Sequence, residues 1–351
     1  MTDPAQKNVL IGLSGGVDSA AAAALLLERG YAVTAVTLWT WQNSDSNDPR
    51  LERASNSANV LGLRHIILDV RQTFYDDVIC PFVGAWKLGK TPNPCVMCNA
   101  TLKFHKLREL ADELGCHYLA TGHYARLTGD APGRFLRRAS YRRHDQSYFL
   151  YRLRQPLLDR LLLPLGEKNK QDARAIASKV QDSVAGTKDS QDICFLESGD
   201  LREYLKNQGF SEEPGPFLDL SGQVIGQHQG SWLFTVGQRR RLGQSFGRRM
   251  TVLSIDHERN SVVLGGEEDA FISEITLGDV VAYQDLPLAF NAGVQLRSQG
   301  STLPASVTMA TDKRQAVVKF KMPVRLSSPG QSVVFYEDDR VLGGGIVEKM
   351  A

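Results

Sequence analysis

Two cysteines, Cys95 and Cys98, stand two residues apart in the proline-containing stretch TPNPCVMCN. A Cys-x-x-Cys pair can be half of a zinc site, a redox couple, part of an iron–sulfur site, or two small buried apolar side chains. Five cysteines in 351 residues are an odd and sparse set, which argues against the disulfide framework of a secreted protein. The pair is therefore expected to react or to bind metal.

The other cysteines narrow the choice. Cys80 and Cys116 lie in apolar helical or strand patterns and are predicted to be core, whereas Cys194 follows the polar segment GTKDSQD. We expect exposed, mobile segments around Cys98 and Cys194, and hence reactive thiols. A closed zinc site lacks its fourth ligand, because the chain has no paired histidine motif. Three thiolates on Cys95, Cys98 and Cys194 would suit a 4Fe–4S cluster with one open iron, so a thiol pair and a cluster both remain open.

The stretch GLSGGVDS stands between the first predicted strand and the first predicted helix. Such a turn directs several backbone N–H groups and the positive helix end at one point, which makes an anion site. Gly15 and Gly16 let a phosphate approach the backbone closely, and Ser14 and Ser19 can add hydroxyl donors. The expected phosphate-binding residues are Gly12, Leu13, Ser14, Gly15, Gly16, Val17, Asp18 and Ser19.

This loop differs from the common nucleotide motifs. It lacks the lysine of G-x-x-x-x-G-K-[ST] and the spacing of G-x-G-x-x-G. Asp18 stands at the helix start instead, where a bare carboxylate would repel phosphate unless it held a magnesium ion between them. We therefore assign Asp18 to magnesium. The alternative, that Asp18 and Ser19 only cap the helix, leaves the two adjacent glycines unexplained.

The elements that must position these residues alternate between strand and helix over roughly the first 120 residues. The predicted strands are NVLIGL (8–13), AVTAVTL (32–38), RHIILDV (64–70) and HYLAT (117–121). Each helical pattern between them ends in a glycine, at Gly30, Gly62 and Gly115. This alternation predicts an α/β fold with a doubly wound parallel sheet.

In the rest of the chain the predicted secondary structure changes twice. From Gln146 to about Gly209 the pattern is helical, and afterwards short alternating segments and glycines dominate. TVLSIDHERNSVVLGG predicts a hairpin, and QAVVKFKMPVRL and SVVFYEDDRVLGGGIV predict further strands. We predict a catalytic domain over 1–209 with a helical segment from about 146, a small central β domain over 210–272, and a C-terminal β domain over 273–351.

Charge and hydropathy indicate the class of partner. The net charge is only +2, yet two arginine clusters contain no acid. They are Arg134, Arg137, Arg138, Arg142 and Arg143, and Arg239, Arg240, Arg241, Arg248 and Arg249. Such clusters attract phosphate backbones, although they can also be solvated faces. No apolar run approaches the ~20 residues of a membrane helix, and the polar start MTDPAQK lacks a signal-peptide apolar region, so we expect a cytoplasmic protein without membrane partners.

The residues S-G-G-V-D-S resemble the pyrophosphate-loop motif of the ATP pyrophosphatases, which have an adenine nucleotide alpha-hydrolase-like fold. Further stretches are similar, in order and nearly from end to end, to the bacterial-type tRNA 2-thiouridylases (tRNA-uridine 2-sulfurtransferases). They are TPNPCVMCNATLKF, LATGHYAR, DQSYFLYRL, KDSQDICFL, GQHQGSWLFTVGQRRRLG and SPGQSVVFY with LGGGIV. The resemblance implies a helical tRNA-binding segment and a last domain that is a β-barrel.

The resemblance also implies a reaction, the ATP-dependent 2-thiolation of the wobble uridine of tRNA. The C2 oxygen is a poor leaving group, and its adenylation makes AMP the leaving group. Cys194 would carry the sulfur as a persulfide, and Cys98 would attack that persulfide or its product, releasing sulfide or closing a disulfide. ATP and magnesium are the implied cofactors, with a 4Fe–4S cluster as the alternative sulfur carrier. Sulfur-donor proteins of a cysteine desulfurase relay are the implied partners, and we expect a monomer.

Other positions carry over by motif. Gly122 and the backbone of Leu38 match nucleotide contacts. The positions that match tRNA contacts are Asn93, Pro94, Cys95, His123, Asp145, Gln146, Ser147, Arg297, Ser298 and Gln331. Cys95 departs from the family pattern, which has an aspartate credited with acid/base work, and a thiol could do this only with a suitably shifted pKa.

Two other functions fit part of the pattern. A pyrophosphate-loop enzyme with a nitrogen nucleophile, such as a tRNA lysidine synthetase or an amidotransferase-type synthetase, needs no cysteine pair. A non-catalytic tRNA-binding protein could use nucleotide only as a switch, and it would show no tRNA-dependent exchange of pyrophosphate into ATP.

Overall fold

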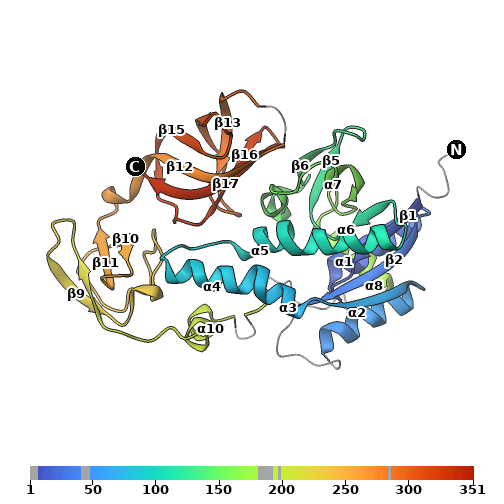
Figure 1. Cartoon of the computed structure of the whole chain (residues 1–351), viewed down its shortest axis with the longest axis horizontal. Helices are drawn as coiled ribbons and strands as arrows, with labels where there is room; N and C mark the ends of the chain where they lie inside the picture. Colours follow the sequence, from blue (N-terminus) through green and yellow to red (C-terminus); the bar gives the residue numbers. More distant parts are fainter. Residues whose placement is uncertain (1–6, 41–47, 181–192, 197–198, 284–285) are drawn as a thin grey trace. The chain divides into compact units, whose positions relative to one another are not determined.

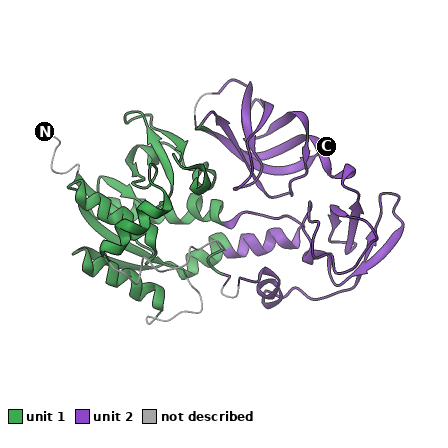
Figure 2. Cartoon of the chain, turned by 180° about the vertical axis from the view of Figure 1, so that it is seen from behind, with its two compact units in different colours: residues 1–78, 95–195, 339–341 green, residues 79–94, 196–338, 342–351 purple. Residues whose placement is uncertain are grey.

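The structure is a computed structural model that describes residues 7–40, 48–180, 193–196, 199–283 and 286–351. The chain divides into two compact units (Figure 2). Unit 1 comprises residues 1–78, 95–195 and 339–341, and unit 2 comprises 79–94, 196–338 and 342–351. Most of the lead-in to Cys194 lies outside the described residues.

A five-stranded parallel sheet forms the centre of unit 1 (Figure 1). Its strands are β1 (Asn8–Gly12), β2 (Ala32–Trp39), β3 (Arg64–Asp69), β4 (Tyr118–Ala120) and β7 (Leu161–Leu162). The order is β3-β2-β1-β4-β7, so the chain runs outward in one direction from β1 and returns to the other side at β4. Loops at the carboxyl ends of β1 and β4 therefore meet at the switch point where such sheets bind ligands. The predicted doubly wound sheet and its four strands are confirmed.

Three helices of this sheet end shortly before the glycines that the sequence indicated. They are α1 (Val17–Glu28), α2 (Pro49–Val60) and α6 (Phe104–Glu113), and the fourth helix is α8 (Lys170–Val180). Gly30 follows α1 at φ +77°, a conformation that a side chain would strain. There the N–H of Gly30 bonds the carbonyl of Leu27, and that of Tyr31 bonds Leu26, so the last turn is closed by backbone alone.

The helical pattern predicted from Gln146 onward is wrong in part. Its first segment, SYFLYRLRQPLLDRLL (147–162), is divided into η5 (Ser147–Leu150) and the single turn α7 (Leu157–Arg160), with Pro156 between them. Proline has no N–H to donate, so the helix is interrupted there. Leu161 and Leu162 then pair with Leu119 and Ala120 as strand β7. One buried and one half-buried leucine fit an edge of the sheet as well as a helix face, and periodicity alone does not separate the two.

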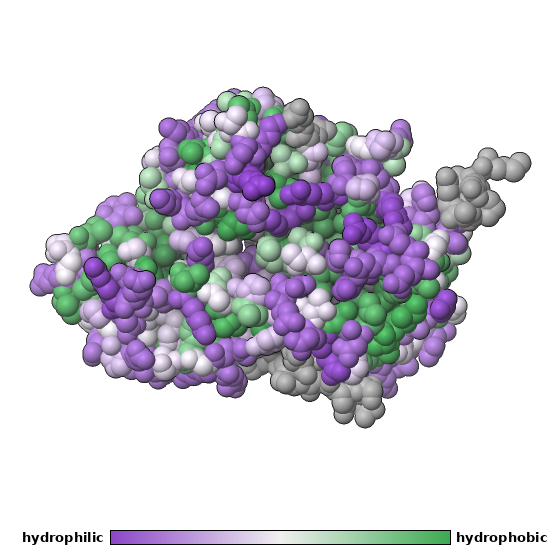
Figure 3. Space-filling model, in the orientation of Figure 1, coloured by the Kyte–Doolittle hydropathy of each residue, from purple (hydrophilic) through white to green (hydrophobic). Residues whose placement is uncertain are grey.

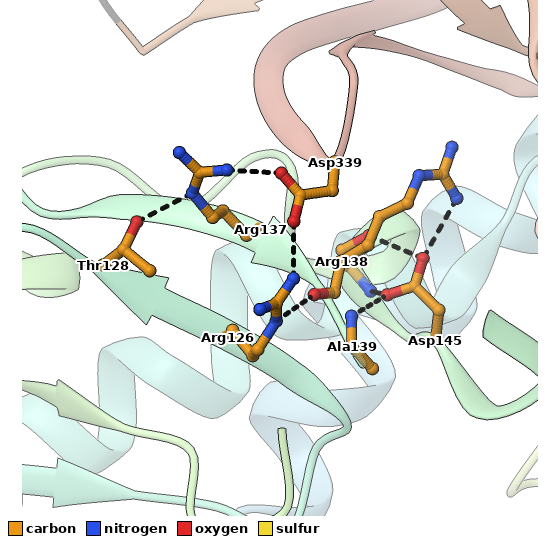
Figure 4. A network of polar contacts seen from close by, with 8 residues as sticks. Arg126, Thr128, Arg137, Arg138, Ala139, Asp145 and Asp339 are labelled. Carbon is orange, nitrogen blue, oxygen red and sulfur yellow. Dashed lines mark hydrogen bonds and ion pairs between the residues drawn. The ribbon is translucent and has the colours of Figure 1, made fainter. Parts of the chain in front are cut away.

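Smaller elements complete unit 1. They are α3 (Arg71–Phe74), η2 (Tyr75–Ile79), α5 (Pro94–Met97), η3 (Cys98–Lys103), β5 (Ala125–Thr128), β6 (Phe135–Arg138) and η4 (Arg142–His144). The hairpin β5–β6 carries an arginine network (Figure 4). Arg126 and Arg137 both bind the carboxylate of Asp339, and Arg138 pairs with Asp145 at 3.0 Å.

The described residues of unit 2 form two β domains and two α-helices. Its helices are α4 (Cys80–Lys87) and α10 (Leu201–Asn207), with the short turns η6 (Ser231–Leu233) and η7 (Glu268–Ala270). The first sheet has the order β10-β11-β8-β9 and consists of β8 (Gly215–Leu218), β9 (Val224–His228), β10 (Thr251–Asp256) and β11 (Ser261–Gly265). The predicted hairpin is β10–β11, which pair antiparallel.

The last domain is a closed six-stranded barrel. Its strands are β12 (Phe271–Ala282), β13 (Ala289–Gln295), β14 (Leu303–Met309), β15 (Ala316–Arg325), β16 (Ser332–Glu337) and β17 (Arg340–Met350). The order is β12-β15-β14-β13-β16-β17, and pairing of β12 with β17 closes the ring. Closure removes the free sheet edges, and residues such as Val294, Val307 and Val318 fill the interior. The expected barrel is confirmed.

Hydrophilic side chains cover much of the face in Figure 3, with apolar areas between them. Among the described residues, no helix has both the length and the apolar character needed to span a membrane.

The buried pair of Arg138 and Asp145 gives a stability prediction. Their side chains are 6% and 5% exposed. Asp145→Asn removes the charge and leaves a buried guanidinium, which typically costs about 3–5 kcal/mol of unfolding free energy. Urea unfolding should therefore show a clearly lower midpoint.

Asp339→Asn is the matched control. Asp339 also pairs with arginines, but the side chains are 23–35% exposed, so we expect a loss of about 1 kcal/mol or less. Equal midpoint shifts for the two variants would contradict the assignment of Arg138–Asp145 as a buried pair.

Candidate functional site: a phosphate loop and three thiols in unit 1

The phosphate loop connects β1 to α1, and its backbone packs so closely against α2 that a side chain does not fit at Gly15. Gly15 has φ +72°, and a Cβ atom there would lie 2.8 Å from the carbonyl oxygen of Arg50 and 2.9 Å from the nitrogen of Ala54. The loop thus packs directly on the backbone of α2. Gly16 is the N-cap residue of α1. Because glycine has no side chain, no N-cap side chain bonds the N–H groups of the first turn.

Gly122 lies on the opposite side of the loop. A Cβ atom at Gly122 would lie 2.7 Å from the carbonyl carbon of Asp18, 2.8 Å from its oxygen and 2.9 Å from the nitrogen of Ser19. The segment after β4 therefore runs against the first turn of α1. This is the strand edge at which the sequence placed Gly122, and the close approach explains why only glycine fits.

The two serines of the loop bond each other. The Ser19 hydroxyl accepts from the N–H of Ser14 at 3.1 Å, lies 3.2 Å from the Ser14 hydroxyl and donates to the carbonyl of Gly16 at 3.0 Å. Ser19 is buried, whereas Ser14 is exposed. Ser19 thus shapes the loop, and Ser14 is the hydroxyl of the two that faces solvent.

A hydrogen bond from Thr37, which is itself bonded to His65, holds Leu13, which lies where the loop leaves β1. The hydroxyl of Thr37 donates to the carbonyl of Leu13 at 2.6 Å and lies 2.8 Å from Nε2 of His65. Because the Thr37 proton is used on Leu13, Nε2 of His65 must carry the proton of the second bond. Burial lowers the pKa of His65, which favours this neutral form. Leu38, the predicted adenine contact, is the next residue of β2 and is half-buried.

The carboxylate of Asp18, which was predicted to hold magnesium, has two protein partners. Nζ of Lys170 lies 2.8 Å from both of its oxygens, and the hydroxyl of Tyr124 donates to Oδ1 at 2.7 Å. Lys170 is the first residue of α8, and Tyr124 follows β4. Neither residue was predicted, because a lysine so distant in sequence gives no local signal.

The segment 145–147, predicted to contact tRNA, supports this network. Gln146 accepts from the N–H of Tyr124 at 2.9 Å and donates its own N–H to the carbonyl of Tyr124 at 2.8 Å. Asp145 accepts from the N–H and the hydroxyl of Ser147 at 3.1 and 2.9 Å. The Asp145 carboxylate also bonds Arg138, so its oxygens have partners inside the unit. The tRNA contacts of these residues stay a prediction.

The Cys-x-x-Cys stretch is helical, whereas the prolines predicted an exposed loop. Cys95 lies in α5 and Cys98 begins the π-helical segment η3, and both are half-buried. Pro94 occupies the first position of α5, where a missing N–H costs nothing. Cys194 is exposed, as expected, and Cys116 is buried. Cys80 is exposed rather than core, because it lies on the outer face of α4.

The fold brings Cys95, Cys98 and Cys194 into one electrostatic environment. Desolvation raises the pKa of Cys98, and desolvation followed by the charge of Cys98 raises that of Cys95. Although Cys194 is exposed as a residue, desolvation of its thiol and then the two other thiols raise its pKa to about 12. Lys103 opposes all three shifts. At neutral pH the thiols are therefore protonated, and Lys103 is the cation that favours their ionisation.

The described residues contain no group of three or more Cys, His, Asp or Glu side chains arranged to hold a metal ion. The three thiols are thus near enough to interact but do not form a ready set of ligands for a cluster. Magnesium makes a smaller demand, because it keeps several waters and needs only one or two carboxylates besides phosphate. Asp18 fits that role once its oxygens are released from Lys170.

His123 lies near Lys103, the cation that also acts on the thiols. Its Nδ1 is 2.8 Å from the hydroxyl of Thr121, and its ring packs on Phe104 with a centroid distance of 5.9 Å. Burial, and then the charge of Lys103, lower the pKa of His123 well below its usual range. The ring is therefore neutral and offers a hydrogen bond rather than a charge.

Unit 2 holds the remaining predicted tRNA contacts. Asn93 and Pro94 follow a segment in which the N–H of Thr91 bonds the carbonyl of Pro329 at 2.7 Å, two residues before Gln331. Arg297 donates to the carbonyl of Leu326 at 3.1 Å, and Gln295 donates to the carbonyl of Ser298 at 2.9 Å. The fold of unit 2 thus collects Asn93, Gln331 and Arg297 from distant parts of the sequence around one set of loops.

Several arginines of the two clusters have acid or carbonyl partners within the protein, which the sequence did not indicate. Arg137 and Arg138 are used in pairs with acids, and Arg134 donates to the carbonyl of Leu161. Arg142 and Arg143 are exposed. In the second cluster Arg239 lies 3.4 Å from Glu267 and Arg248 3.9 Å from Glu268, on exposed surface. The remaining members, Arg240, Arg241 and Arg249, are exposed.

The position of Lys103 predicts thiol reactivity. Lys103→Met removes the positive charge, so the pKa of Cys98 and Cys194 rises further and less thiolate is present at a given pH. We expect alkylation of both by iodoacetamide at pH 8 to slow by roughly two- to tenfold. Peptide mass spectrometry gives each rate, with exposed Cys80 as the internal reference.

Lys106→Met is the control, because Lys106 pairs with Glu109 on the exposed side of α6. It should leave both rates unchanged. Unaltered rates in the Lys103 variant would show that Lys103 does not act on these thiols.

Comparison with known proteins gives a consistent result along the whole chain. The tRNA methyl transferase HUP domain matches residues 7–198, the tRNA methyl transferase PRC-barrel domain 202–266, and the aminomethyltransferase beta-barrel domain 273–347. A protein of Carboxydothermus hydrogenoformans named tRNA-specific 2-thiouridylase MnmA is 40% identical and covers 98% of each chain. Proteins of the same name from Pelotomaculum thermopropionicum and Clostridioides difficile are 39% and 38% identical over 97% and 98% of each chain.

Proposed function

This chain belongs to the family of tRNA-specific 2-thiouridylases, and we propose that it converts the wobble uridine of tRNA to 2-thiouridine at the expense of ATP. The observation that carries the proposal is that Cys98 and Cys194, far apart in sequence, interact in the unit that also holds the phosphate loop. A tRNA-binding switch protein would need no such thiols, and a synthetase with a nitrogen nucleophile would need none either. The proposed domains are 1–209, 210–272 and 273–351.

The first step is adenylation. The C2 oxygen of the uridine attacks the α-phosphorus of ATP, the bond from this phosphorus to the bridging oxygen breaks, and pyrophosphate leaves with the electron pair. The loop N–H groups, Ser14 and the end of α1 bind the phosphates. Asp18 would hold a magnesium ion, whose chemistry is to neutralise charge on the phosphate oxygens. Gly122 and the backbone of Leu38 line the nucleotide.

The second step transfers sulfur. The terminal sulfur of a persulfide on Cys194 attacks C2, and AMP leaves with the electron pair of the C2–O bond. The Cys98 thiolate then attacks Sγ of Cys194, which breaks the S–S bond to the base, leaves sulfur on C2 and forms a Cys98–Cys194 disulfide. A thiol reductant resets the pair, and sulfur-donor proteins of a cysteine desulfurase relay reload Cys194. Lys103 lowers the cost of ionising both thiols.

Cys95 takes no part in the sulfur transfer in this scheme. Its pKa is raised by desolvation, so it is a neutral thiol at physiological pH. Asn93, Pro94 and Cys95 hold the extruded base, and His123, Asp145, Gln146, Ser147, Arg297, Ser298 and Gln331 contact the tRNA. The enzyme acts as a monomer in the cytoplasm.

The decisive experiment is nucleoside mass spectrometry on tRNA incubated with ATP, magnesium and a persulfide source. Cys194→Ser and Cys98→Ser should abolish 2-thiouridine, whereas Cys80→Ser, an exposed control, should retain it. Cys95→Ala should retain much activity in aerobic, iron-free protein, because the cysteine pair carries the sulfur. Retained activity in both serine variants would favour a nitrogen nucleophile.

The cluster alternative makes the opposite forecast for Cys95. If Cys95, Cys98 and Cys194 hold a 4Fe–4S cluster, all three single variants lose activity, and wild-type protein gains activity in step with iron bound under anaerobic reconstitution. Full activity in protein with iron content near zero would eliminate it.

Binding of tRNA should depend on salt. Each phosphate neutralised lowers log affinity by roughly 0.7 to 0.9 for a tenfold rise in salt. Replacing Arg239, Arg240 and Arg241 together by alanine should flatten this slope in a filter-binding titration. Because Arg239 is shared with Glu267, Arg240 and Arg241 should account for most of the change. An unchanged slope would show that these arginines are a solvated surface and do not contact tRNA phosphates.

A further inference from the structure

The ion pair between Lys170 and Asp18 places a lysine at the mouth of a loop whose own sequence has none. Nζ of Lys170 lies 2.8 Å from both oxygens of Asp18, in the first turn of α1. The Lys170 side chain is 16% exposed and that of Asp18 is 31% exposed, so the pair is partly accessible to solvent. The ammonium also lies 5.8 Å from the ring centroid of Tyr124. Three elements therefore converge on one point: the start of α1, the start of α8 and the segment after β4.

This arrangement explains how a loop with an acid can bind a polyanion. The loop sequence supplies N–H groups and hydroxyls but no cation. With Lys170 on Asp18 the two charges cancel, so the carboxylate does not repel an approaching phosphate. If Asp18 held a magnesium ion on a bound phosphate, Lys170 would lose its partner and would be free to bind the phosphate oxygens. An ammonium on a flexible stem can make that exchange with a small side-chain movement.

We propose that Lys170 is a further catalytic residue of the adenylation step, in which its ammonium moves from Asp18 to the non-bridging oxygens of the departing pyrophosphate. This proposal rests on the proposed function. As the bond from the α-phosphorus to the bridging oxygen breaks, negative charge grows on the leaving group, and Lys170 stabilises that charge without giving up its proton. Lys170 thus places a positive charge on the phosphates, as the lysine of a Walker motif does, although it comes from a distant part of the sequence.

A purely structural ion pair is the alternative, because α1 and α8 pack together and Lys170–Asp18 joins them. The two roles differ in what they bind. Loss of a purely structural pair should affect binding of ligands with and without phosphate alike. Loss of a lysine that contacts pyrophosphate should weaken pyrophosphate binding alone.

The test compares the affinities for magnesium pyrophosphate and for adenosine by calorimetry in full-length protein. Lys170→Met should weaken pyrophosphate binding by roughly ten- to a hundredfold and leave adenosine binding within about twofold. It should slow tRNA-dependent ATP–pyrophosphate exchange by roughly a hundredfold or more. Lys170→Arg should restore most of the pyrophosphate affinity. Lys179→Met, on the exposed face of α8, is the matched control and should behave as wild type.

Equal loss of pyrophosphate and adenosine binding in Lys170→Met, or no loss of either, would overturn the proposal. A second measurement uses wild-type protein and does not depend on the variant folding. Acetylation of lysines, mapped by mass spectrometry, should fall at Lys170 but not at Lys179 when magnesium pyrophosphate is added, and adenosine should protect neither. Unchanged labelling of Lys170 would also overturn it. If wild type forms no 2-thiouridine yet Lys170 is protected, the proposed function fails while the phosphate role of Lys170 stands.

Discussion

The carboxylate of Asp18 connects the phosphate loop to the rest of the α/β unit. Lys170 reaches it from α8, and Tyr124 reaches it from the segment after β4. Gln146 holds Tyr124 through both backbone groups, and the neighbouring Asp145 is anchored on Arg138. A partly exposed ion pair such as Lys170–Asp18 contributes at most about 1 kcal/mol to stability. Its consequence is positional, because one acid determines where three chain segments lie around the nucleotide loop.

Close backbone packing makes this position possible. Gly15 rests on α2 and Gly122 rests on the start of α1, at separations where a Cβ atom would overlap with backbone. Backbone cannot move aside as a side chain can, so these glycines set the width of the loop. The result is a closely packed backbone around the predicted phosphate site, at the point where the strand order of the sheet reverses.

The thiols occupy a different electrostatic setting from the loop. Desolvation keeps Cys95, Cys98 and Cys194 protonated at rest, and Lys103 is the opposing charge. Protonated thiols react slowly with stray oxidants, because the thiolate is the nucleophile.

The sequence by itself determined the parallel sheet, the phosphate loop, the hairpin β10–β11 and the barrel strands β15 to β17, because each depends on local periodicity, glycine position or a continuous motif. Residues such as Gly15, Gly122 and Cys98 could be singled out for the same reason. It misjudged the segment after Gln146 and the exposure of Cys80, where a short apolar run fits more than one environment. Only the tertiary structure decided that Lys170 and Tyr124 hold Asp18, that Lys103 faces three thiols, and that Arg137 and Arg138 are used internally. Charge partners are chosen by distance in space, and a sequence does not record that distance until the chain has folded.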